Sequence, residues 1–272
     1  MRRHPFDELL ELDTVDIRLD CAALHLARDE YPDIDVLSTL NRLDDLATDV
    51  AAKRPGISLP NRFQALRAVL VEDFGLRGNE DYYDPDNSYL NRVLERRVGI
   101  PITNSIIWME VARRLNWPAE GIGFPGRFLV RMEDAEYYVL IDPFQEGRTL
   151  SLSDCAELLS QQSENKVKLT AEHLEPADTR AILIRMLNNL RGIYLAQSNW
   201  SALARVLERL SAAEPENPRH VTELAGVRFR LGDVFGAYGP MFAFVQSRPD
   251  APEAPEVRHQ LRRLTSAIAA RN

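Results

Sequence analysis

Arg127 and Asp142 are the residues whose types and spacing best fit a binding site. Residues 127–132 place Phe128, Val130 and Met132 on one face of a strand, 133–136 are polar, and 137–141 form an apolar run, a pattern that predicts an antiparallel hairpin. Arg127 then begins the first strand and Asp142 ends the second. A guanidinium can hold an anionic ligand or a partner's carboxylate with two hydrogen bonds, or it can form a salt bridge that only holds the strands together. The sequence leaves both alternatives open.

The element that must position this pair is an apolar helix expected from about residue 101 to 115. Gly99 precedes it and can take a positive φ, and Pro101 supplies a fixed φ at the helix start. Thr103, Asn104 or Ser105 can cap the first N–H groups. The helix is apolar over most of its circumference, so we expect it to be largely buried. A buried helix whose N-terminus faces a hairpin is the layout of a site where a cysteine at the helix start is activated by a strand histidine.

The chain's thiols and imidazoles do not occupy that layout. Cys21 and His25 are four residues apart on a predicted helix, and Cys155 follows a predicted capping box, but in both cases a buried small side chain is the simpler interpretation. The five histidines are scattered without metal-ligand spacing. We therefore expect no catalytic residue, no metal site and no cofactor. A reactive Cys21 or Cys155 remains the alternative.

Five short motifs occur in order around the predicted hairpin. They are Tyr82-Tyr83-Asp84-Pro85-Asp86-Asn87-Ser88-Tyr89-Leu90, Arg97-Val98-Gly99-Ile100-Pro101-Ile102, Gly121-Ile122-Gly123-Phe124-Pro125-Gly126, Phe128-Leu129-Val130-Arg131 and Asp142-Pro143-Phe144. On these motifs, which span about a quarter of the chain, the sequence resembles the SirB family. That resemblance implies a transglutaminase-like N-terminal half, a tetratricopeptide C-terminal half, and a role in protein interaction or regulation without catalysis.

The sequence departs from the resembling family's catalytic pattern at two places. The strand motif of the family has a histidine where this chain has Arg127, and arginine cannot act as a general base because it stays protonated. The transglutaminase cysteine position, near 100–103, holds no cysteine, while Asp142 remains. We expect a degenerate site whose binding residues are Arg127, Asp142, Asn87, Asn104, Pro101 and Tyr89. Tyr82, Tyr83, Tyr89 and Phe124 either line a groove there or close the domain's core.

Composition limits the classes of function. The 272 residues carry a net charge of −8, which argues against a nucleic-acid binder. No segment approaches the roughly 20 apolar residues of a membrane span, and the N-terminus from Met1 to Glu8 turns acidic where a signal peptide would be apolar. The two distant cysteines fit a reducing compartment. We therefore expect a cytoplasmic protein.

The last third of the chain contains an internal repeat. Pro215 and Pro249 are 34 residues apart, and at the same offset Ser198-Asn199-Trp200 corresponds to Gly232-Asp233-Val234, Leu203 to Ala237 and Leu210 to Phe244. A 34-residue period with a small polar pair before the second helix is typical of tetratricopeptide repeats. Their helix pairs form a concave face that binds peptides. Polar residues that could face such a groove are Arg185, Asn188, Asn189, Arg191, Arg228 and Arg230.

The predicted fold class is α+β: a helix-rich, papain-like transglutaminase-like domain with a small antiparallel sheet, followed by an all-α tetratricopeptide-like domain. We place the first domain at 1–172, with a helical part at 1–80 and a core at 81–160, and the second at 173–272. The predicted function is non-catalytic interaction with protein partners through the repeats. The alternatives are a cysteine peptidase or transamidase with an atypical nucleophile, and a sensor of a small anionic ligand.

Overall fold

The computed structural model describes residues 4–163 and 166–269. Met1 to Arg3, which open the segment used above to argue against a signal peptide, lie outside these residues. The chain divides into two compact units, Leu12–Met186 and Met1–Glu11 with Leu187–Asn272. The domain boundary at 172 stays a prediction.

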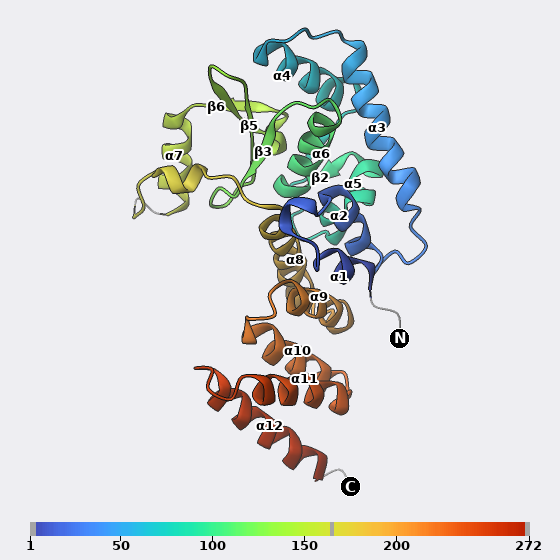
Figure 1. Ribbon diagram of the computed structural model, residues 1–272, viewed down its shortest axis with the longest axis vertical. Coiled ribbons are helices and arrows are strands. Elements are labelled where there is room, and N and C mark those ends of the chain that lie inside the picture. Colours follow the sequence, from blue (N-terminus) through green and yellow to red (C-terminus); the bar gives the residue numbers. More distant parts are fainter. Residues whose placement is uncertain (1–3, 164–165, 270–272) are drawn as a thin grey trace. The chain divides into compact units, whose positions relative to one another are not determined.

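The larger unit consists of helices followed by a sheet (Figure 1). Its helices are α2 (Leu19–Ala27), α3 (Val36–Ala52), α4 (Leu59–Arg67), α5 (Leu90–Arg96), α6 (Pro101–Arg114), α7 (Leu152–Gln162) and the first turns of α8 (Thr179–Ala196). Its strands are β1 (Arg77–Gly78), β2 (Val98–Gly99), β3 (Ala119–Ile122), β4 (Leu129–Glu133), β5 (Tyr138–Asp142) and β6 (Arg148–Leu150). Short 3₁₀ turns occupy Thr14–Asp16, Pro85–Ser88, Pro143–Gln145 and Ala171–Leu174, and a π-helical segment, Ala68–Asp73, continues α4.

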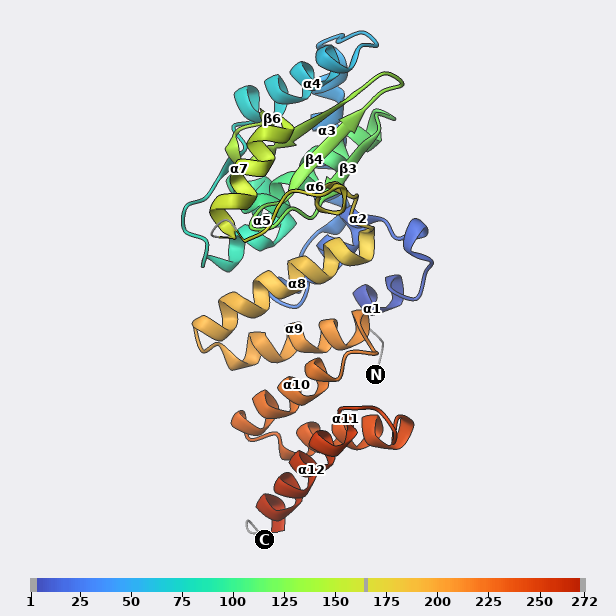
Figure 2. The same ribbon diagram turned by 90° about the vertical axis from the view of Figure 1, so that its left-hand side faces the viewer.

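The four-stranded sheet has the order β3-β4-β5-β6, with every neighbouring pair antiparallel. The predicted hairpin is its central pair, in which Val130 lies opposite Ile141. Both faces are covered, by α6 on one side and α7 on the other (Figures 1 and 2). Leu129 and Leu140 pack with Cys155 and Leu159 of α7 in one apolar cluster. The sheet thus has two strands more than the hairpin predicted from the sequence, and the α+β fold class is confirmed.

Helix α6 is the central element of this unit, and every residue from Ile102 to Ala112 is buried. Pro101 is its first residue, as expected. Gly99 does not take a positive φ. A Cβ at this position would lie 2.4 Å from Asn104 Oδ1 and 2.8 Å from Thr103 Oγ1. Glycine is therefore needed here to let strand β2 approach the start of α6.

The smaller unit contains α1 (Pro5–Leu9), the remainder of α8, α9 (Trp200–Ala213), α10 (Pro218–Arg230), α11 (Val234–Ser247) and α12 (Ala254–Ala269). Figure 2 shows α9 to α12 following one another as a stack of helices. Asn199 and Asp233 are the N-caps of α9 and α11 and accept from Ala202 N and Gly236 N. The residues before them, Ser198 and Gly232, both have positive φ, 55° and 82°. The 34-residue repeat is therefore also a repeat of backbone conformation.

A proline inside α11 is compensated by the neighbouring helix. Pro240 has no N–H, so the carbonyl of Gly236, four residues earlier, loses its helical donor. Arg228 of α10 donates from Nη1 to that carbonyl over 2.7 Å. A side chain of α10 thus completes the hydrogen bonding of α11.

Candidate functional site

The start of α6 is closed by a network of buried amides and hydroxyls. Thr103 Oγ1 donates to Asn87 O over 2.7 Å and accepts from Ile100 N over 3.1 Å, which caps the helix. Asn87 Nδ2 donates to Asp81 O over 2.8 Å, and its Oδ1 accepts from Asn79. Asn87 and Thr103 are both fully buried. The loop at 79–88 is therefore attached by hydrogen bonds to the start of α6.

Asn104 lies beside this network and faces β1. Its Nδ2 donates to Arg77 O over 3.1 Å, and the residue has no exposed surface. Its Oδ1 has no hydrogen-bond donor among the described residues. Asn104 therefore holds β1 on α6, and its other amide atom is the close neighbour that excludes a side chain at position 99.

Arg127 and Asp142 form the predicted pair. Arg127 Nη1 donates to Asp142 Oδ2 over 2.6 Å, with Arg127 about one quarter exposed and Asp142 buried. Asp142 Oδ1 also accepts from the backbone N–H groups of Phe144 and Gln145. Burial raises the pKa of Asp142, and Arg127 with the two N–H groups counteracts part of that rise. Of the two alternatives left open above, the salt bridge is present in the structure.

The loop that carries Arg127 is held from three sides. Gly126 turns it with a φ of 68°. Ser105 Oγ, on α6, donates to Phe128 O over 3.0 Å. Arg185 Nη2, on α8, donates to Phe124 O over 3.1 Å and to Arg127 O. The loop of Arg127 is thus held next to the first turns of α6.

The six predicted binding residues do not form one open surface. Pro101, Asn87 and Asn104 meet at the start of α6, and Ser105 connects that region to the loop of Arg127. Tyr89 is buried and packs edge-on against Tyr31, with ring centroids 5.5 Å apart. The aromatic set does not stay together either, because Phe124 is buried while Tyr82 and Tyr83 are about half exposed. Whether any of these residues binds a ligand stays a prediction.

Neither thiol has the environment of a nucleophile. Cys155 is fully buried between α7 and the sheet, and burial raises its pKa. Cys21 is half-buried, and burial together with the carboxylate of Asp20 raises its pKa as well. Within the described residues, no group of three or more His, Cys, Asp and Glu side chains is placed to hold a metal ion.

A cluster of buried charged residues lies at the other end of α6 and was not predicted from the sequence. Glu110 is 3% exposed, and Asp20 is fully buried. Asp20 accepts from Arg18 over 2.8 Å and from Arg114 over 2.8 Å; burial opposes its ionisation, but these hydrogen bonds outweigh that effect and lower its pKa. Burial and the charge of Asp20 raise the pKa of Glu110. The available signal was a single acidic residue inside an otherwise apolar helix.

The arginines predicted to face a groove of the repeats contact other parts of the chain. Arg191 pairs with Glu223, and Arg228 pairs with Glu208 in addition to Gly236 O. Arg230 lies over the ring of Trp200, 4.8 Å from its centroid. Arg185 belongs to the larger unit, where it holds the loop at 124–127. Whether any of these side chains also lines a peptide-binding groove of the repeats stays a prediction.

Comparison with known proteins agrees with this architecture. A family model described as the transglutaminase-like superfamily matches residues 38–188, and a tetratricopeptide repeat model matches 190–262. A UPF0162 protein of Xylella fastidiosa is 34% identical over 261 residues, which cover 94% of this chain and 93% of that protein. The chain belongs to the UPF0162 family, within the transglutaminase-like superfamily.

The family extends to other bacteria, and part of the chain has a wider likeness. A UPF0162 protein of Escherichia coli is 26% identical over 90% of each chain. F-box only protein 21 of Homo sapiens is 31% identical over 180 residues, which are 62% of this chain and 28% of that protein. No solved structure gives a significant match. Within the described residues, no helix is both long and apolar enough to span a bilayer.

Proposed function

We propose that this protein is a non-catalytic interaction protein, in which a degenerate transglutaminase-like domain accompanies a repeat domain that binds a protein partner. One observation carries the proposal. The region 100–103, where the resemblance places a nucleophile, holds Thr103, whose hydroxyl caps α6, and the loop before β4 holds Arg127, paired with Asp142, where the resemblance places a base. A hydroxyl that caps a helix and a protonated guanidinium supply neither a thiolate nor a proton acceptor.

The partner surface that we assign to the repeats lies on α11. Phe235 is 83% exposed and Phe242 is 44% exposed, and Tyr238 stacks on Phe242 with ring centroids 5.6 Å apart. These three aromatic residues are spaced at three and four positions, so they share one face of the helix. Exposed aromatic side chains of this kind are enriched in protein interfaces. The tetratricopeptide match supports the same role, because such repeats commonly bind proteins.

We also propose that the family corresponds to the SirB group and that the protein works in the cytoplasm. The five motifs that span the degenerate site support the first statement. The second is supported by two cysteines that are not joined in a disulfide.

The test compares three full-length variants in an affinity capture with the intact protein as bait, read by quantitative mass spectrometry. Phe235→Ala combined with Phe242→Ala should remove the captured partner, whereas Arg127→Ala should retain it. Leu37→Ala serves as the control, since Leu37 is a similarly exposed apolar residue of α3, 69% exposed. Retention of every partner by the double variant would remove α11 from the proposal. Release of ammonia from a glutamine peptide by the purified protein, lost in Cys21→Ser or Cys155→Ser, would overturn the non-catalytic role.

A further inference from the structure

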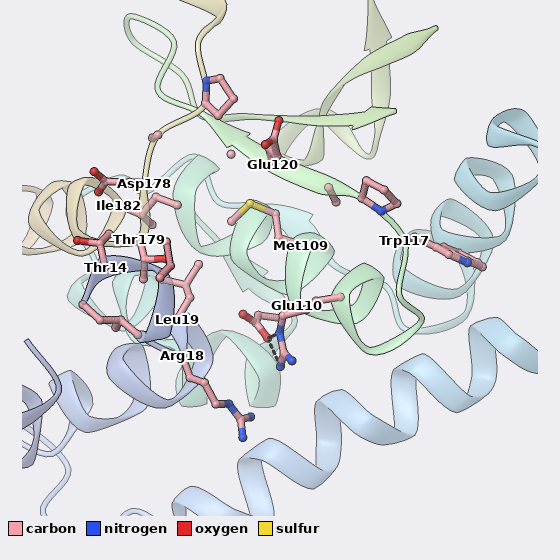
Figure 3. A pocket seen from close by; sticks show the side chains of 18 of the residues that line it. Thr14, Arg18, Leu19, Met109, Glu110, Trp117, Glu120, Asp178, Thr179 and Ile182 are labelled. Carbon is pink, nitrogen blue, oxygen red and sulfur yellow. Dashed lines mark hydrogen bonds and ion pairs between the residues drawn. The ribbon is translucent and has the colours of Figure 1, made fainter. Parts of the chain in front are cut away.

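Two pockets of the larger unit differ in how their charged groups are bonded. The larger, of about 880 Å³, lies beside the C-terminal half of α6, and Figure 3 shows the carboxylate of Glu110 there, held by guanidinium hydrogen bonds. The buried charge of that pocket is therefore already paired. The smaller pocket, of about 500 Å³, is lined by residues of α3 between Ser38 and Asp45, by Phe74, and by residues 91–97 at and after α5. Its arginines have no such partners.

Arg42 and Arg97 meet at the smaller pocket on one aromatic ring. The Cζ atoms of the two guanidinium groups lie 5.2 Å and 5.3 Å from the centroid of the Phe74 ring. Phe74 is 4% exposed, so its ring holds both groups in place. Neither guanidinium has a hydrogen bond or an ion pair within the part of the chain that the structure describes. Stacking leaves the N–H edge of a guanidinium available, so both groups can donate to a ligand.

The backbone of Arg97 is strained where its side chain reaches this pocket. The residue ends α5 with a φ of 61°, in the left-handed region. Glycine is the usual residue at such a helix end, because a β-carbon is strained there. Strain of this kind is concentrated at binding sites, where a particular side chain is needed. Replacement of Arg97 by glycine would relieve the strain and remove the guanidinium, so it can separate the two roles.

Free neutral hydrogen-bonding groups lie beside the two arginines. Oδ1 of Asn91 is buried without a donor, whereas its Nδ2 is accessible and forms no hydrogen bond to the described residues. On the side of α3, Ser38 and Asn41 are exposed, and their side chains have no hydrogen bond within the described part of the chain either. The pocket thus combines two free cations with three neutral polar side chains.

The charges that face this pocket favour an anion. Its acidic lining residues are Asp45 and Glu95. Glu95 is bonded to Arg92, which lies outside the lining. Among the lining residues, Arg42 and Arg97 are therefore opposed by Asp45 alone, and they repel each other because one ring holds both. An anion that contacts both guanidinium groups would offset that repulsion.

We propose that this pocket binds a small phosphorylated polyol, such as a sugar phosphate. Arg42 and Arg97 donate to the phosphate, for which guanidinium groups are preferred partners, and Asn91 Nδ2 donates to its remaining oxygen. Ser38 and Asn41 bond the hydroxyl groups of the ligand. A phosphate monoester carries nearly two negative charges and three acceptor oxygens, so it matches two cations better than a carboxylate does.

The size of the pocket agrees with this ligand, because a volume of about 500 Å³ lies in the usual range for small-molecule sites. The pocket shares no residue with the degenerate site or with the aromatic face of α11. The proposal can therefore succeed or fail independently of the function proposed above.

Isothermal titration calorimetry of the full-length protein at low salt tests the proposal with glucose 6-phosphate, ribose 5-phosphate, glucose and inorganic phosphate. At least one sugar phosphate should bind about tenfold more tightly than inorganic phosphate, the gain that one or two neutral hydrogen bonds supply. Glucose should give no heat of binding at the same concentration, since it lacks the charge. Acidification through about pH 6 should weaken the binding of the sugar phosphate, because the phosphate takes up a proton.

Three variants locate the binding. Arg42→Gln and Arg97→Gly should each weaken the binding of the sugar phosphate about tenfold, the factor that one hydrogen bond between charged groups supplies. Arg97→Gly should nevertheless fold, because glycine suits its φ. Arg54→Gly is the matched control: Arg54 is an exposed arginine after α3 with a φ of 52°, so the same substitution removes the same charge and should leave binding unchanged. Far-ultraviolet circular dichroism confirms the folding of each variant.

Several results would overturn the proposal. One is the absence of binding by both sugar phosphates and by inorganic phosphate at millimolar concentration. Equal affinity for inorganic phosphate and for both sugar phosphates would exclude the polyol. Unchanged affinity in the folded Arg42→Gln and Arg97→Gly variants would exclude this pocket, and an equal loss in Arg54→Gly would reduce the effect to net charge.

Discussion

Arg127 and Asp142 are joined by a hydrogen-bonded ion pair of 2.6 Å between Nη1 and Oδ2, which connects the loop before β4 to the end of β5. In the degenerate site that we propose, this pair would stand in place of a base and its orienting acid. Because arginine stays protonated, the pair stabilises the hairpin without being able to exchange a proton with a substrate.

Removing the carboxylate of Asp142 should destabilise the protein. Asp142→Ala leaves Arg127 Nη1 and the N–H groups of Phe144 and Gln145 without their acceptor at a buried position. We expect a loss of about 1–3 kcal/mol in the free energy of unfolding, since unsatisfied buried donors cost that much. Urea unfolding at pH 7 measures it. The exposed pair of Lys53 and Asp73 is the control, and Asp73→Ala there should change stability by about 0–1 kcal/mol.

The pH dependence of stability should reveal the raised pKa of Asp142. Between the unfolded value, about 3.9, and the higher folded value, the native state binds more protons than the unfolded state. This residue's contribution to stability therefore rises as the pH falls through that window and is constant above it. Asp142→Asn cannot titrate, so the stability of the wild type minus that of the variant should increase on acidification from pH 7. A difference that decreases instead would place the folded pKa below the ordinary value.

Both thiols should be unreactive in the native protein. Iodoacetamide should label Cys155 only after unfolding, because the residue has no exposed surface. Cys21 should react slowly, with a pH midpoint above that of a free cysteine, as its raised pKa requires. Mass spectrometry of labelled peptides across pH gives both results. Rapid labelling of either residue below pH 7 would contradict this expectation and reopen the enzyme alternative.

Two glycine substitutions should distinguish a glycine that close packing requires from a glycine that only adds conformational freedom to the chain. Gly99→Ala places a methyl group 2.4 Å from Asn104 Oδ1, so we expect a loss of about 1–3 kcal/mol and a disturbed start of α6. Gly226 is an exposed residue inside α10, and a Cβ there meets nothing within 4 Å. Gly226→Ala should therefore raise the free energy of unfolding by about 0.5–1 kcal/mol. Thermal and urea unfolding of both variants provide the comparison.

The parts of the structure that could be predicted correctly from the sequence are determined by residues that are close to one another in the chain. Pro101 sets the start of α6, and Asn199 and Asp233 cap α9 and α11 through residues three positions later. Strands β4 and β5 could also be predicted, because each contains its own run of apolar residues. In contrast, β3 has the sequence Ala-Glu-Gly-Ile and β6 has only three residues, so neither carries a strand pattern. They form strands because they pair with the two outer edges of the hairpin of β4 and β5.

Features that the sequence could not predict depend on residues far apart in the chain. Arg114 and Asp20 are 94 positions apart, so no spacing rule connects them, and the pocket above Glu110 could not be foreseen. Arg185 was expected in a groove, but it donates to a carbonyl 61 positions earlier. The sequence offered only the conformational freedom of Gly99, whereas packing against Asn104 is what excludes a side chain there. Each of these follows from the assembled packing of the unit.

The hydrogen bond from Arg228 to the carbonyl of Gly236 has a consequence for the order of events in folding. Pro240 leaves a gap in the hydrogen bonds of α11, and only a guanidinium supplied by α10 fills it. Helix α11 taken alone is thus an incomplete helix, and α10 must already be in place for it to reach its full stability. Loss of α10 is therefore expected to weaken α11 as well, because the two helices share this hydrogen bond.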